Sequence, residues 1–104
     1  MNRPEHLLIC LAEECSEVSQ RVSKALRFGL SEVQPGQELN NAQRIELEAN
    51  DLISVLEILE DEGVIRLRGS EEVRERKKAK LAKFMDYAKE CGSLEQDSKP
   101  GSAK

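Results

Sequence analysis

The chain has 104 residues, of which 35% are charged and 3% aromatic, and its formal net charge at pH 7 is −4. A chain of this length forms one domain at most, with a limited core of its own. Its longest apolar run is broken by Ser54 and Glu57, so it lacks the roughly 20 apolar residues that span a bilayer. The negative charge and the scarcity of aromatic residues argue against nucleic-acid binding. We therefore expect a small soluble protein without a membrane or nucleic-acid partner.

Three cysteines, Cys10, Cys15 and Cys91, are odd in number and form no Cys-x-x-Cys pair. We recognise no signal peptide before them. This pattern favours reduced thiols in a cytoplasmic protein over the disulfides of a secreted one.

The first predicted helix begins at Pro4 or Glu5, since proline is well tolerated in a first turn, and it ends at Gly29. Residues three, four and seven apart share one face of a helix, and this spacing shows which side turns inward. Glu14 interrupts the otherwise apolar inward stripe, and Glu17 lies beside it. The stripe consists of Leu7, Leu11, Glu14, Val18, Val22 and Ala25.

Residues 30–41 are predicted to form a loop, because they contain Pro35-Gly36 and Asn40-Asn41. The loop is long for a connection between two packed helices. A loop of this length is either a functional lid or a mobile connection, and the sequence leaves both alternatives open.

The second predicted helix covers residues 42–61 and repeats the main feature of the first. Glu48 stands in its inward stripe, and Asp51 lies one turn beyond Glu48. The apolar members of this stripe are Ile45, Leu52, Val55 or Leu56, and Leu59.

The third predicted helix begins after Gly69-Ser70 and ends near Cys91. Ser70 is the predicted N-cap, and Glu71 and Glu72 in the first turn favour the helix dipole. The helix combines a basic run with one apolar face. The basic residues are Arg74, Arg76, Lys77, Lys78, Lys80 and Lys83, and the apolar ones are Val73, Leu81, Phe84, Met85 and Ala88.

Carboxylates at inward positions of two successive helices predict a metal site. An unpaired buried carboxylate costs several kcal/mol, so it must meet a cation, take up a proton or reach water. Oxygen ligands without a nearby histidine or thiolate suit Mg²⁺ or Mn²⁺, and Mg²⁺ commonly takes substrate phosphates as further ligands. Solvated acidic faces are the common alternative for any single Glu-x-x-Glu spacing.

The run Glu13-Glu14-Cys15-Ser16-Glu17, followed by Glu48-Ala49-Asn50-Asp51, resembles the paired EExxE and ExxD signature of the MazG-like, all-α nucleoside triphosphate pyrophosphatases. The resemblance covers residues 6–62. Matched by position, it implies that Glu14, Glu17, Glu48 and Asp51 hold Mg²⁺, with Glu13 in a supporting role. The 30 residues between Glu17 and Glu48 form a longer spacer than is typical, which leaves the course of the loop open.

The resemblance also implies an all-α bundle of three main helices per chain, completed by self-association as a homodimer or homotetramer. The implied reaction converts a nucleoside triphosphate to the monophosphate and pyrophosphate, with Glu13 or Glu17 accepting a proton from water. Cations must help to neutralise the triphosphate. Lys77 and Lys80 are the first candidates, and Lys24 and Arg27 are further ones.

Residues 1–91 are predicted to form the helical domain, and residues 92–104 a disordered tail, because they are rich in Gly, Ser, Lys and Pro and lack periodicity. Two alternatives to an enzyme remain. The chain could be a helical interaction protein whose acidic stripes face solvent, or a nucleotide-binding protein that keeps the fold without turnover.

Overall fold

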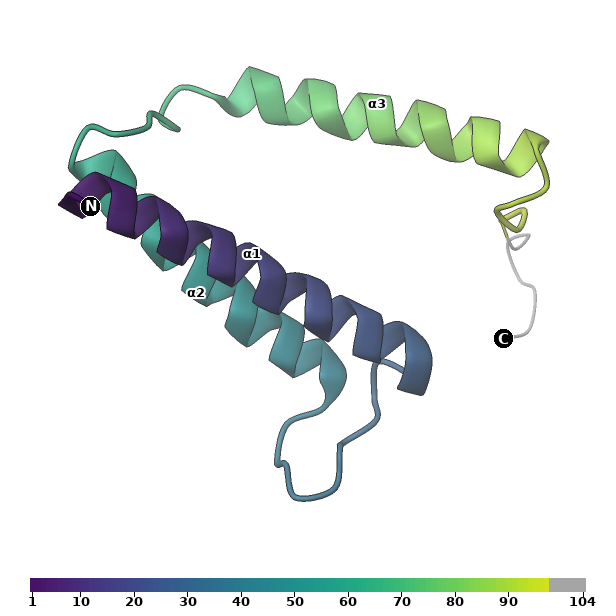
Figure 1. Ribbon diagram of the computed structural model, residues 1–104. Helices are drawn as coiled ribbons and strands as arrows, with labels where there is room; N and C mark the ends of the chain where they lie inside the picture. Colours follow the sequence, from purple (N-terminus) through teal and green to yellow (C-terminus); the bar gives the residue numbers. More distant parts are fainter. Residues whose placement is uncertain (98–104) are drawn as a thin grey trace. The chain divides into compact units, whose positions relative to one another are not determined.

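The computed structural model describes residues 1–97 and is all-α, as predicted (Figure 1). Its three helices are α1 (Arg3–Phe28), α2 (Asn41–Asp61) and α3 (Glu71–Glu90). The chain divides into two compact units, the first of residues 1–66 and the second beginning at Leu67. Within residues 1–97, no helix combines the length and apolar character that crossing a bilayer requires.

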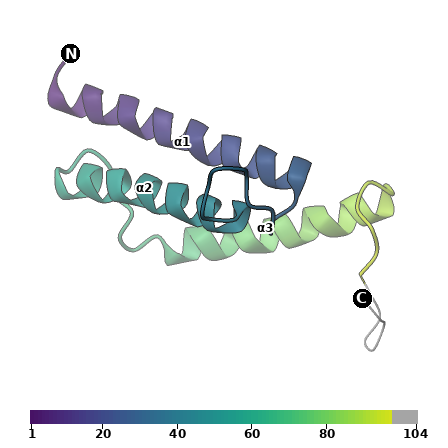
Figure 2. The same cartoon turned by 90° about the horizontal axis from the view of Figure 1, so that it is seen from below.

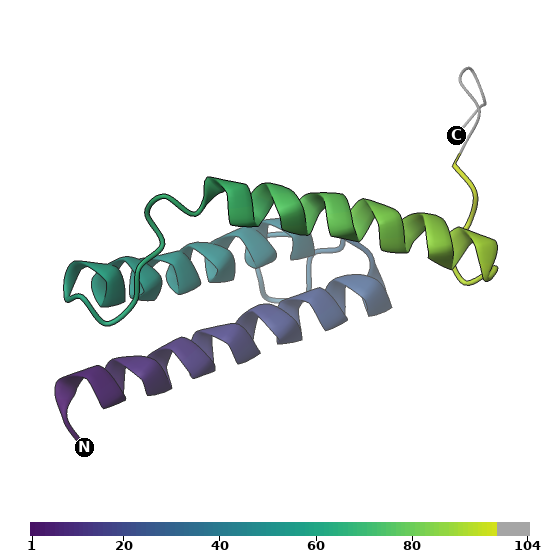
Figure 3. The same ribbon diagram turned by 90° about the horizontal axis from the view of Figure 1, so that it is seen from above.

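The first unit is an antiparallel hairpin in which α1 and α2 lie side by side along their length (Figures 1, 2 and 3). The start of α1 therefore meets the end of α2. There the Arg3 guanidinium donates to both carboxylate oxygens of Glu62, at distances from 2.6 to 3.0 Å. Because Arg3 is 69% exposed, this pair contributes little energy, but it links residues at opposite ends of the unit's sequence.

Both helices of the hairpin begin with a capping box, which the sequence analysis did not anticipate. Asn2 Oδ1 accepts from the Glu5 backbone N–H at 2.9 Å, and Glu5 Oε1 accepts from the Asn2 N–H at 3.1 Å. Asn40 and Gln43 make the same reciprocal pair at 2.8 and 2.9 Å. Each box satisfies backbone donors that the first turn of a helix leaves unpaired, so it fixes where the helix starts.

The connection between α1 and α2 is held at its base by the side chain of Asn41, which is 2% exposed. Its Nδ2 donates to the Gly29 carbonyl and to Glu32 Oε1, both at 2.8 Å. Backbone bonds from Asn41 N to Glu32 O and from Ala42 N to Leu30 O close the same base at 3.1 and 3.0 Å. Gly29, with φ of 100°, ends α1 in a conformation that favours glycine. These hydrogen bonds therefore hold the two ends of the connecting loop together.

The inward stripes agree with the sequence pattern, with one correction. Val22 was predicted to face inward but is 41% exposed, whereas Arg21 is half-buried. The reason is that α2 lies on the Arg21 side of the apolar stripe and covers only part of its width. Among residues 1–97 the only buried apolar side chains are Ala25, which is 7% exposed, and Leu59, which is 0% exposed, so the hairpin has a thin core.

The second unit contains α3, none of whose side chains is buried. Ser70 occupies the N-cap position, but its side chain makes no capping hydrogen bond, because its backbone angles of φ −100° and ψ 17° are not those of an extended cap residue. After α3 the chain turns back, with Ser93 N bonded to Ala88 O and Lys89 Nζ paired with Asp97 Oδ2. The rest of the predicted tail, residues 98–104, lies outside the described residues.

Replacing Asn41 with alanine should destabilise the hairpin, because the Gly29 carbonyl and Glu32 would lose their buried donor. We expect a loss of about 1–3 kcal/mol in the free energy of unfolding, measured by urea denaturation followed by circular dichroism. Asn50→Ala is the matched control, since Asn50 is exposed and bonds only to the Glu46 carbonyl of its own helix. Equal effects of the two substitutions would refute the anchoring role of Asn41.

Candidate metal centre

The carboxylates predicted as metal ligands come from facing helices of the hairpin. Glu14 and Glu17 on α1 and Glu48 on α2 are half-buried, whereas Asp51 on α2 is exposed. Glu13, the predicted supporting residue, is exposed as well. Antiparallel packing thus brings the centre of α1 opposite the centre of α2. This pairing comes from the packing of the two helices, because no local feature of the chain requires it.

Glu48 is the residue at which the acidic groups meet. Burial raises the pKa of its carboxyl group, and the neighbouring carboxylates of Glu17 and Asp51 raise it further. Each of these neighbours lies near enough to share a hydrogen bond with a protonated Glu48. The structure therefore brings together three of the four predicted ligands. Glu14 faces the same helix interface but does not contribute to the raised pKa.

The donor set fits a hard divalent cation, because Glu48 and the two neighbours that raise its pKa, Glu17 and Asp51, all offer carboxylate oxygens. Within residues 1–97, however, no three acidic, histidine or cysteine side chains stand at ligand spacing. Carboxylates that repel one another spread apart, and Glu side chains have three rotatable bonds with which to reorient. Convergence around an ion would therefore involve rotation of these side chains.

Arg21 is a further candidate that is not among the site residues predicted from the sequence. It is half-buried on the α2-facing side of α1, and its Nη1 is buried without a hydrogen-bond partner. A buried guanidinium nitrogen without an acceptor is costly, so this position favours an anion. The signal in the sequence was the spacing of four residues after Glu17 and seven after Glu14, which places Arg21 on the carboxylate-bearing face.

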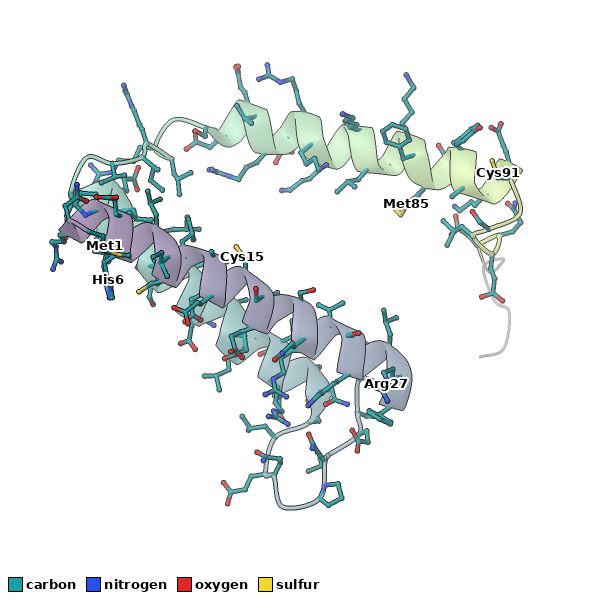
Figure 4. The ribbon with its side chains drawn as sticks, in the orientation of Figure 1. Met1, His6, Cys15, Arg27, Met85 and Cys91 are labelled. Carbon is teal, nitrogen blue, oxygen red and sulfur yellow. The ribbon has the colours of Figure 1, made fainter. Side chains whose placement is uncertain are left out.

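The two predicted phosphate-binding residues of α1 differ in their surroundings. Lys24 is half-buried and lies seven residues after Glu17, on the same side of the helix. Arg27 is exposed, and its guanidinium lies 5.0 Å from the centre of the Phe28 ring (Figure 4). Stacking of this kind holds Arg27 at the end of α1. Lys24 is therefore the better placed of the two.

Lys77 and Lys80, the other predicted phosphate-binding residues, are exposed on α3 in the second unit. Lys80 lies with its Nζ 5.9 Å from the centre of the Phe84 ring. Together with Lys83, Phe84 and Tyr87 it lines a surface depression along the helix. A role of these lysines at the acidic site stays a prediction.

Comparisons of this chain with protein-family models, with curated proteins and with solved structures give no match. The resemblance of its two acidic runs to the MazG-like signature therefore stays a prediction from the sequence.

In the metal-free protein, Glu48→Gln should increase stability at about pH 8 and have little effect at about pH 3.5. A carboxyl pKa raised above its usual 4.5 means that the folded state binds the proton more tightly than the unfolded chain. Its stabilising contribution is present below pH 4.5 and is lost as the pH rises through the raised pKa. We expect a gain of a few tenths to about 1 kcal/mol at the higher pH.

Urea denaturation in the presence of chelator measures this difference. Glu46→Gln is the control, because Glu46 is exposed on the same helix and its carboxyl group is not among those that raise the Glu48 pKa. A Glu48→Gln protein that is less stable than the wild type at about pH 8 would contradict mutual repulsion in the cluster.

Proposed function

We propose that the protein is a Mg²⁺-dependent nucleoside triphosphate pyrophosphohydrolase, with Mn²⁺ able to replace Mg²⁺. The observation that carries this proposal is the meeting of Glu17, Glu48 and Asp51 from two helices at a partly buried position. Carboxylates gathered in this way destabilise the folded chain unless a cation is supplied. The resemblance of the two acidic runs to the MazG-like signature supplies the class of reaction.

The proposed ligands are Glu14, Glu17, Glu48 and Asp51, which offer oxygen atoms only. When bound, Mg²⁺ would neutralise phosphate oxygens and make the attacking water more acidic. The water oxygen forms a bond to phosphorus as the anhydride bond between the α- and β-phosphates breaks, which gives the nucleoside monophosphate and pyrophosphate. The role of the hairpin is to hold the carboxylates on two stiff helices.

A carboxylate near the site must accept the proton that the attacking water loses. Glu17 suits this role better than Glu13, because Glu17 is half-buried beside Glu48 whereas Glu13 is exposed. Burial and the neighbouring carboxylates raise the pKa of Glu48, so in the metal-free protein it holds its proton more tightly than an ordinary glutamate.

Cationic side chains would complete the site on the substrate side. A triphosphate carries about four negative charges, and transfer at phosphorus depends mainly on positioning and charge neutralisation. Arg21 and Lys24 lie on the carboxylate-bearing side of α1 and are our first choice among the residues of the hairpin. We propose that they bind phosphate groups, with Lys77 and Lys80 as candidates from the second unit.

The wild-type protein should release pyrophosphate from at least one member of a panel of standard and modified nucleoside triphosphates when Mg²⁺ or Mn²⁺ is present. Chelator should abolish the release. Glu48→Gln should lower kcat/KM by on the order of a hundredfold or more, because it removes a charged ligand from the centre of the cluster. Enzyme-coupled detection of pyrophosphate measures the rate.

The matched control is again Glu46→Gln, which changes the same residue type on the exposed side of α2 and should keep the wild-type rate. Mn²⁺ binding, followed by electron paramagnetic resonance without nucleotide, separates two outcomes. Binding that depends on Glu48 without turnover would indicate a nucleotide- or metal-binding protein. Neither binding nor turnover would leave a helical interaction protein and overturn the proposal.

Arg21→Gln should raise KM for the triphosphate by about tenfold with a smaller change in kcat, if its guanidinium contacts a phosphate group. The Lys24→Gln protein should change in the same direction. Arg27→Gln is the control, since Arg27 is exposed and stacks on Phe28. An unchanged KM in Arg21→Gln would show that Arg21 serves only to balance the charge of the carboxylates.

A further inference from the structure

Basic and acidic residues are unevenly divided between the two units of the chain. Residues 1–66 hold 13 acidic and 6 basic residues, whereas residues 74–83 of α3 hold six basic residues and one acidic residue. The net charge of −4, from which we expected no nucleic-acid binding, is thus an average over an acidic hairpin and a strongly basic helix segment. A concentration of positive charge along one helix indicates an anionic partner.

One side of α3 combines basic with aromatic residues. Successive residues are about 100° apart around a helix, so six residues of α3 lie within an arc of about 100°. This basic-aromatic strip consists of Val73, Arg76, Lys80, Lys83, Phe84 and Tyr87. All six are exposed, Phe84 at 57% and Tyr87 at 62%. The acidic residues of α3 lie in a different arc, with Glu72 and Glu90 at the border of the strip.

The basic residues of the strip differ from other basic residues of α3 in their lack of a carboxylate partner within the described chain. Arg74 pairs with Glu71 at 3.8 Å, and Lys78 pairs with Glu75 at 3.0 Å. Within residues 1–97, none of the three basic residues of the strip forms an ion pair. Their positive charges are therefore available to an anion from outside the chain.

The aromatic rings of the strip lie beside its ammonium groups. Lys80 Nζ lies 5.9 Å from the centre of the Phe84 ring. The surface depression of about 460 Å³ along α3 has mainly carbon walls, and it is lined by Lys80, Lys83, Phe84 and Tyr87. Bases stack on aromatic rings, and phosphates bind to ammonium groups. Each nucleotide of a strand offers both a base and a phosphate, so the strip matches the chemistry of a nucleic acid strand.

We propose that the basic-aromatic strip of α3 binds single-stranded nucleic acid. Phe84 and Tyr87 stack on unpaired bases. Arg76, Lys80 and Lys83 contact the phosphates. A single strand fits better than a duplex, because the bases of a duplex already stack on one another and offer no face to an exposed ring. The strip lies wholly within the second unit, so this inference does not depend on hydrolysis at the acidic site (Figure 1).

The same helix is less suited to a membrane surface. A helix that lies on a bilayer needs a continuous apolar side. The apolar side of α3 carries Leu81, Met85 and Ala88, but Arg74 and Lys77 interrupt it. A bilayer would have to accept these two charges among its acyl chains, whereas a bound strand leaves them in water.

Fluorescence anisotropy of a fluorescein-labelled oligo(dT) strand of about twelve nucleotides tests the proposal on the full chain. With chelator present, the strand should bind with a Kd in the micromolar range at about 50 mM NaCl. Three phosphate contacts should make the affinity fall by about twentyfold between about 50 and 200 mM NaCl. Because chelator removes metal from the acidic site, failure of the proposed hydrolysis would leave this result unchanged.

Substitutions within the strip separate stacking from charge. Phe84→Leu and Tyr87→Leu should each lower the affinity by about tenfold, because leucine keeps the apolar bulk but offers no ring, whereas Tyr87→Phe should bind as the wild type does. Lys80→Gln should lower the affinity by about fivefold and reduce its salt dependence. Lys78→Gln is the matched control and should have little effect, since Lys78 lies outside the strip and pairs with Glu75. Circular dichroism should show the wild-type helix content in every variant.

The lack of any binding at about 50 mM NaCl would overturn the proposal. So would equal or tighter binding of a duplex of the same length, because charge alone would then explain the affinity. Displacement of the strand by thymidine monophosphate at the same nucleotide concentration would assign the strip to free nucleotides instead. Tighter binding to vesicles of phosphatidylcholine and phosphatidylglycerol would assign it to a membrane. Equal losses in Lys80→Gln and Lys78→Gln would show that the contact is not made by the strip.

Discussion

The antiparallel packing of α1 on α2 is the constraint on which the rest of this structure depends. It places the middle of one helix against the middle of the other, and in both places the inward stripe contains a glutamate. Glu48 is half-buried at this interface, and the carboxylate of Glu17 on the other helix lies beside it. The raised pKa of Glu48 follows directly from this contact between two helices that the chain joins through a well-bonded loop.

The hairpin separates its chemistry between two opposite faces. One face gathers the carboxylates together with Arg21 and Lys24, and the other consists of uncharged residues. A cation or a phosphate requires an open face with charge, whereas helix association requires a face from which charge is absent.

Because the core is thin, the fold depends on interactions at its ends and surfaces. Two buried apolar side chains cannot stabilise a helix pair by themselves, so caps and buried polar contacts carry unusual weight. The two capping boxes fix where α1 and α2 start, and Asn41 ties the connecting loop to Gly29 and Glu32. In such a protein each cap or anchor is a large fraction of the total stability.

Much of the fold could be predicted from the sequence because it depends on local features. Periodicity gave three helices within one or two residues of their ends, and Gly29 marked the end of α1 because glycine accepts a positive φ. The Asn-x-x-Glu and Asn-x-x-Gln capping boxes were also readable from spacing, although they were overlooked. The four acidic positions were identified from residue type and spacing alone.

Only the tertiary structure decided which of these positions meet. Spacing along one helix cannot tell which part of a wide apolar stripe its partner covers, so Val22 was expected inside and Arg21 was not. For the same reason Glu17, beside the inward stripe, meets Glu48 across the two helices, whereas Glu14, within the stripe, does not contribute to the pKa of Glu48. Helical periodicity determines a face, whereas the rotation of one helix against another determines which residues on that face come into contact.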